Sequence, residues 1–91
     1  MTRSRFDELR HVALDQGAGD TQRSAAVQEL SEFGTREAAE AILELGSRPG
    51  EVELLLRAAG AGLARIQASR VSVSEWDIRD LTAPAAEAFL E

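Results

Sequence analysis

The chain contains no cysteine, lysine, tyrosine or asparagine, and it has a single histidine. Without cysteine it can form neither disulfides nor cysteine-based zinc sites, and without lysine it cannot form a Schiff base. A single histidine also leaves few schemes for acid/base catalysis. We therefore expect a protein that is not an enzyme and that needs neither a cofactor nor a metal ion.

Long apolar runs are also missing, and none approaches the roughly 20 residues that a membrane-spanning helix needs. The first residues are charged where a signal peptide would become apolar. We therefore expect a cytoplasmic protein without a membrane partner. The abundance of Ala, Arg, Glu, Leu and Gly, together with the missing lysine and asparagine, is typical of a GC-rich, bacterial genome.

A chain of 91 residues is expected to form one small domain, residues 1–91, with a correspondingly small core. Its 10 basic residues are all arginine and stand against 16 acidic residues, so the net charge is −6. This charge disfavours nucleic acid as a partner, because the chain and the phosphate groups repel each other. The composition favours a basic protein as the partner.

Apolar residues recur at intervals of three and four positions, while β-branched and aromatic residues are sparse, which predicts an all-α fold. Asp20 or Thr21 can cap the second helix, Gly34 can end it in the left-handed conformation, and Thr35 can cap the third. The predicted helices cover about residues 3–15, 21–33, 36–45, 51–68 and 72–81, and Pro84 opens a last turn or two.

The predicted fourth helix is the most hydrophobic, since apolar residues occupy two of its sides, and we expect it to lie centrally. Gly60 and Gly62 each cost about 1 kcal/mol relative to alanine inside a helix, which is reasonable where another backbone packs closely. The predicted inward residues are Phe6, Leu9, Val12 and Ala13; Ala26, Val27, Leu30 and Phe33; Ala38, Ala41, Ile42 and Leu45; and Val52, Leu55, Leu56, Ala59, Leu63 and Ile66.

A weak internal repeat is also present. A shift of the chain by 33 residues places helix on helix and loop on loop, and Gly17 then falls on Gly50. Such a repeat is typical of a helical solenoid, in which neighbouring helix pairs complete one core. The alternative is an ordinary Ala/Leu-rich bundle, in which such matches arise by chance.

Two segments resemble the second helices of HEAT repeats, namely residues 23–30 with Phe33-Gly34 after them, and residues 52–66. The resemblance covers about residues 3–67 and implies a short right-handed solenoid of about two helix pairs. Residues 72–91 lie outside the resemblance, and we expect them to form a C-terminal helical cap. HEAT proteins are mostly binding scaffolds, so the resemblance also implies protein binding. The second helix of a HEAT repeat carries a Val-Arg pair, and Glu53 stands where the arginine would follow Val52. The ladder of Asp-to-Arg contacts between repeats is therefore not predicted for this chain.

Acidic residues gather in the middle of the chain, where seven glutamates between residues 29 and 53 stand against two arginines. Glu37, Glu40 and Glu44 form a stripe on the predicted third helix, because their spacing is i, i+3 and i+7. This stripe can dock an Arg/Lys-rich partner, which would raise the association rate. The alternative is an ordinary solvated helix face.

The single tryptophan, Trp76, projects near Asp77 and Asp80 on the predicted fifth helix and away from the apolar residues of that helix. A tryptophan among acidic residues is a common anchor of protein interfaces. The alternative is that Trp76 packs on the end of the fourth helix as part of a cap. The predicted partner-binding residues are Glu37, Glu40, Glu44, Trp76, Asp77 and Asp80.

These features together predict a non-catalytic, acidic protein-binding module. The sharper hypothesis is an immunity or antitoxin-type inhibitor that neutralises a basic toxin domain, for instance a nuclease, because small size and strong acidity suit that role. The alternative is a structural adaptor or oligomerising subunit, which would assemble with itself or with a larger complex through Leu54, Ala58 and Ala61.

Overall fold

The computed structural model describes residues 4–48, 50–68, 79 and 81–90. Within these ranges the regular structure is entirely helical, and no strand occurs, so the all-α prediction is confirmed for this part of the chain. None of the described helices combines the length and the apolar composition that crossing a bilayer requires. The helices are α1 (Arg5–Leu14), α2 (Asp20–Phe33), α3 (Arg36–Gly46), α4 (Glu53–Ala68) and α6 (Ala83–Leu90).

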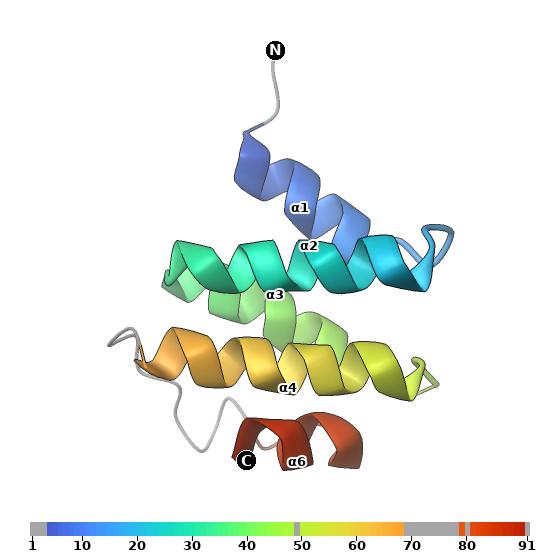
Figure 1. Ribbon diagram of the computed structural model, residues 1–91, viewed down its shortest axis with the longest axis vertical. Helices are drawn as coiled ribbons and strands as arrows, with labels where there is room; N and C mark the ends of the chain where they lie inside the picture. Colours follow the sequence, from blue (N-terminus) through green and yellow to red (C-terminus); the bar gives the residue numbers. More distant parts are fainter. Residues whose placement is uncertain (1–3, 49, 69–78, 80, 91) are drawn as a thin grey trace.

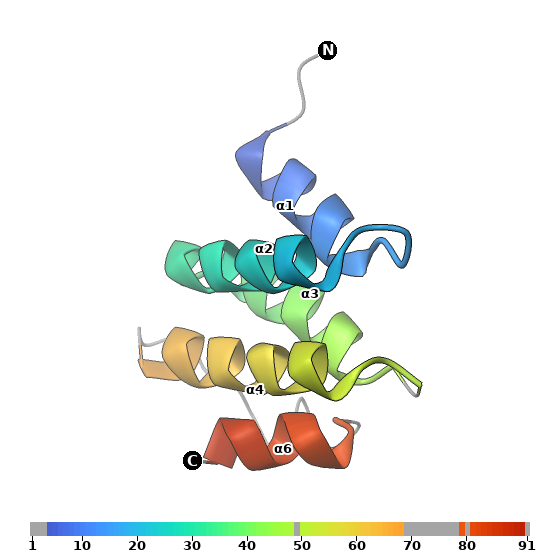
Figure 2. The same cartoon turned by 45° about the vertical axis from the view of Figure 1, so that its right-hand side comes forward.

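The helices are arranged around α4. Helices α2 and α4 lie side by side and run in the same direction, with α3 behind them, as Figure 1 and Figure 2 show. Helix α1 lies at the end of the array next to α2, and its last part passes behind α2. Helix α6 lies against α4 on the side away from α2 (Figure 1). Because α4 contacts α2, α3 and α6, the prediction that the helix with two apolar sides lies centrally is confirmed.

Local capping signals set several of the helix ends. The Ser4 hydroxyl accepts the Asp7 N–H at 3.1 Å, and the Thr35 hydroxyl accepts the Ala38 N–H at 3.2 Å. Gly34 ends α2 with a φ of 60°, a left-handed conformation that glycine adopts without steric cost. The predicted roles of Thr35 and Gly34 are therefore confirmed.

Four predicted helix starts are wrong by one or two residues. Helix α1 begins at Arg5 and not at residue 3, because Ser4 is its N-cap. Helix α2 begins after Gly19, and no side chain supplies a capping hydrogen bond, so neither Asp20 nor Thr21 is the cap. Helix α4 begins two residues after Glu51, because the Glu51 carboxylate is bound to a side chain of α2 and also accepts the Val52 N–H. Helix α6 begins one residue before Pro84. Most of the predicted helix over residues 72–81 lies outside the described residues.

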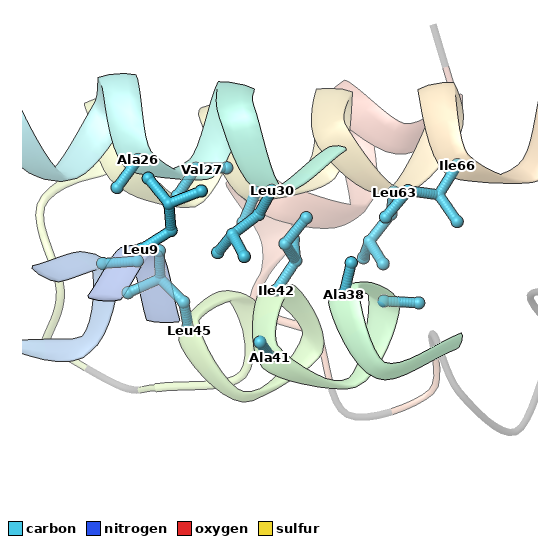
Figure 3. Packing of buried hydrophobic residues seen from close by; sticks show 13 residues of the cluster. Leu9, Ala26, Val27, Leu30, Ala38, Ala41, Ile42, Leu45, Leu63 and Ile66 are labelled. Atoms are coloured by element: carbon cyan, nitrogen blue, oxygen red, sulfur yellow. The ribbon is translucent and has the colours of Figure 1, made fainter. Parts of the chain in front are cut away.

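The core forms where the apolar faces of α1, α2, α3 and α4 meet. Figure 3 shows Leu30, Ile42 and Leu63 pointing toward one another from three of these helices. Two residues predicted to face inward are instead exposed, namely Phe33 at 42% and Val52 at 43%. Phe33 is the last residue of α2 and packs edge-on against Phe6 of α1, with ring centroids 5.7 Å apart. Val52 precedes α4.

Close packing explains the two glycines of α4. A Cβ atom at Gly60 would overlap the carbonyl oxygen of Ala85 in α6, and one at Gly62 would lie 3.3 Å from Ile42. The predicted close approach of another backbone is therefore confirmed at Gly60, whereas Gly62 packs against side chains.

Two hydrogen bonds fix the start of α6 to the end of α3. The N–H and the hydroxyl of Thr82 each donate to the Gly46 carbonyl at 3.0 Å.

We predict that Gly60→Ala lowers the free energy of unfolding by about 1–3 kcal/mol in urea denaturation, because the new methyl group must displace α6. At a helical position with free space around it, a change from glycine to alanine would raise the free energy of unfolding by about 1 kcal/mol. The sign of the measured change therefore shows whether α6 packs closely on Gly60. Ala61→Gly, at the adjacent exposed position, calibrates the intrinsic difference between the two residue types. A gain in stability for Gly60→Ala would contradict the packing of α6 on α4.

Candidate functional site

The three predicted glutamates of α3 line one groove between α1 and α3. Glu37, Glu40 and Glu44 are all exposed, and the groove has a volume of ≈ 530 Å³. Helix α1 adds a fourth carboxylate, Asp7, to the same groove. We call this surface the acidic face; its lining residues are Phe6, Asp7, Arg10, Glu37, Glu40, Ala41 and Glu44.

Arginines neutralise part of the acidic face. Arg10 of α1 donates to Glu44 at 3.1 Å, and Arg36 lies 3.5 Å from Glu40. No salt bridge joins Glu37 to another of the described residues. Exposed pairs of this kind contribute about 0–1 kcal/mol to stability, so arginines or lysines of a partner can replace them at low cost.

The other predicted binding residues, Trp76, Asp77 and Asp80, lie outside the described residues. Their contribution to a binding surface stays a prediction. Asp7 and Phe6 were not predicted for this surface, and they reach it because α1 packs beside α3. The positions of Phe6 and Asp7 along α1 do not show that α3 packs beside them, so the sequence alone could not predict that they belong to this surface.

The most strongly desolvated charges of the described chain are those of Arg23 and Glu51. The Arg23 guanidinium donates twice to the Glu51 carboxylate, at 2.9 and 2.7 Å, and once more, from Nε, to the Ala13 carbonyl at 3.1 Å. The two side chains are 3% and 8% exposed. This bidentate pair joins the end of α1, the body of α2 and the segment before α4.

The Arg23–Glu51 pair has a structural role. Its hydrogen bonds occupy both carboxylate oxygens, and no buried side-chain polar atom among the described residues lacks a partner. The Arg23 guanidinium, which hydrogen-bonds Glu51, holds the pKa of that carboxyl below its ordinary value of 4.5. Arg48 strengthens the same region by donating to the Leu14 carbonyl at 2.9 Å. A carboxylate held in this way is a poor proton donor or acceptor near neutral pH.

No family model, curated protein or solved structure matches the chain. In the described part of the chain, no group of three or more His, Asp or Glu side chains is placed to hold a metal ion. The acidic face carries the predicted residues Glu37, Glu40 and Glu44.

We predict that Arg23→Ala lowers the free energy of unfolding by about 2–4 kcal/mol, because it leaves the Glu51 carboxylate and the Ala13 carbonyl without their hydrogen-bond donor. Chemical denaturation measures the change. Arg5→Ala is the matched control, since Arg5 pairs with Glu29 at 2.6 Å but with side chains 62% and 46% exposed. The control should lose at most about 1 kcal/mol, and similar losses in both variants would contradict the role of burial.

The depressed pKa of Glu51 predicts a specific pH dependence. Its pKa is lower in the folded than in the unfolded chain, so the pair stabilises the fold above pH 4.5 and this contribution is lost as the pH falls through the folded pKa. The stability difference between the wild type and Glu51→Gln should therefore be large near neutral pH and shrink in acid. A difference that stays constant from about pH 7 to about pH 3 would contradict the assignment.

Proposed function

We propose that this chain is a non-catalytic protein-binding module and that its acidic face binds a basic partner protein. The observation that carries the proposal is the convergence of four carboxylates from α1 and α3 on one groove, around the apolar side chains of Phe6 and Ala41. Complementary charge steers a basic partner toward such a surface and sets its orientation, while the apolar residues add contact area.

We further propose that the two helix pairs stack as in a short HEAT-like solenoid. In support, α2 and α4 run in the same direction side by side, and α1 and α3 form a second layer (Figure 2). The Arg23–Glu51 pair supports it too, because it links a helix of the first pair to the start of the second. In such a stack the acidic face lies where two adjacent pairs meet, which is where solenoids commonly present binding surfaces.

The more specific form of the proposal is a bacterial immunity or antitoxin-type inhibitor. A toxin domain that acts on nucleic acid carries a cationic surface for its substrate, and an acidic groove can occupy that surface. Speed matters for an inhibitor of this kind, and electrostatic steering raises association rates above those of neutral surfaces. The cytoplasm, expected from the sequence, is the compartment in which we propose that it acts.

A second candidate function is that of an adaptor or oligomerising subunit. The observation that favours it is the exposure of Leu54, at 57%, on α4. Ala61, on the same helix, is exposed too, and with Ala58 it lines a groove of ≈ 180 Å³ beside Ser24 and Gln28 of α2. Exposed apolar residues of this kind are typical of contact surfaces between subunits when they occur together.

To test the proposal, the chain is crosslinked in its native cells, the partner is identified, and its affinity is measured with purified proteins. The variant Glu37→Gln/Glu40→Gln/Glu44→Gln should weaken binding by at least about tenfold, and the wild-type affinity should fall as salt rises. The control, Asp20→Asn/Glu53→Gln/Glu87→Gln, removes the same charge from exposed positions elsewhere. It should leave the affinity within about twofold.

Two results would overturn the acidic face as the binding surface. One is equal affinity for the wild type and the acidic-face variant, and the other is an equal loss in the control variant. A molar mass that rises with concentration in light scattering and that is unaffected by charge removal would favour the adaptor. In that case Leu54→Ser should abolish the association.

A further inference from the structure

Another groove runs between α1 and α2. It has a volume of ≈ 750 Å³, and its apolar floor combines Leu9 and Val12 of α1 with Ala25 and Ala26 of α2. A smaller hollow of ≈ 290 Å³ extends it toward Phe33. We call this surface the α1–α2 groove.

The α1–α2 groove lies on the outer side of the first helix pair. Its α2 residues include Ala25 and Glu29, whereas Ser24, Gln28 and Ser31 line the groove between α2 and α4. At about 100° per residue the mean directions of these two sets lie about 110° apart around α2. The groove therefore opens on a different side of α2 from the one that α4 covers.

The two ends of the helix array differ. At one end α6 covers the outer side of α4, with Ala85 in close contact with Gly60 (Figure 1). At the other end no element within the described ranges covers the α1–α2 groove. On each helix, side chains at positions i, i+3, i+4 and i+7 form ridges on the surface. A third helix can pack into the groove between the ridges of two neighbouring helices.

The rim of the groove shows what charge an occupant would carry. Four carboxylates border the groove and its extension, and they come from Glu8, Asp15, Glu29 and Glu32. Arg5 spans the groove between Glu8, at 3.7 Å, and Glu29, at 2.6 Å. Carboxylates outnumber this arginine, so the rim favours a basic occupant. A second copy of the chain is disfavoured, since each copy carries a net charge of −6.

We propose that the α1–α2 groove binds a basic amphipathic α-helix of a partner protein. The apolar stripe of that helix packs between Val12 and Ala25, and its arginines or lysines pair with Glu8, Glu29 and Glu32 along the rim. Helix α1 has 10 residues and is about 15 Å long, so the bound helix spans about three turns. The inference goes beyond the proposed function, because none of these residues belongs to the acidic face.

The test uses three synthetic peptides of about 14 residues. The first carries leucines at i, i+3, i+4 and i+7 with lysines between them, the second is a scrambled form of the same composition, and the third has glutamate for lysine. Binding to the ¹⁵N-labelled chain is followed by NMR titration. The first peptide should bind saturably and shift the amide signals of Leu9, Val12, Ala25 and Ala26, and the other two should not.

Two matched variants localise the binding. Ala25→Arg places a long cationic side chain in the groove, and it should weaken binding of the first peptide by about tenfold or more. Ala61→Arg makes the same change at an exposed alanine of α4 and should change the affinity less than about twofold. Glu32→Lys, at another exposed position, should weaken binding without filling the groove. Circular dichroism verifies that each variant is folded.

Several outcomes would overturn the inference. One is the absence of saturable binding, and another is equal binding of the scrambled peptide, which would reflect charge attraction without a helix. A third is binding that Ala25→Arg leaves intact but that the acidic-face variant removes, which would leave the proposed function standing. The fourth is self-association of the chain that Ala25→Arg blocks, because the occupant would then be a second copy.

Discussion

The ion pair between Arg23 and Glu51 joins the first helix pair, α1 and α2, to the second pair, α3 and α4. Arg23 belongs to α2, Glu51 precedes α4, and the third hydrogen bond of Arg23 reaches the Ala13 carbonyl near the end of α1. Apolar contacts are not directional, so the core would tolerate small shifts of one pair along the other. Hydrogen bonds between charged groups that are shielded from water allow only much smaller shifts, because a larger shift would leave a charged group without its hydrogen-bond partner. The groove between α1 and α3 depends on this arrangement, because it lies where the two helix pairs meet.

Helix α1 borders both the acidic face and the α1–α2 groove. Asp7 lines the acidic face and Glu8 lines the α1–α2 groove, because consecutive helical residues point about 100° apart. The cations are distributed in the same way. Arg10 crosses to Glu44 over the acidic face, and Arg5 crosses to Glu29 over the other groove. In each case an exposed ion pair bridges two helices, and a basic partner would compete for its carboxylate.

Much of the fold follows from the sequence, because helix periodicity and glycine placement are local signals. The α3 face and the close packing at Gly60 were predicted from such signals. The Arg23–Glu51 pair was not, since its residues lie 28 positions apart and meet through the packing of whole helices. For the same reason the glutamate stripe of α3 was predicted, but its partner side chains on α1 were not. Phe33 fits the apolar period of α2, yet it lies at the helix end and stays 42% exposed.

A double-mutant cycle on Arg23 and Glu51 tests most directly whether this pair holds the two helix pairs together. The free energies of unfolding of the wild type, Arg23→Ala, Glu51→Ala and the double variant give the coupling energy between the side chains. We predict a favourable coupling of at least about 2 kcal/mol near neutral pH, because both groups are desolvated and hydrogen-bonded in two places. A coupling below about 0.5 kcal/mol, as for independent sites, would contradict the account.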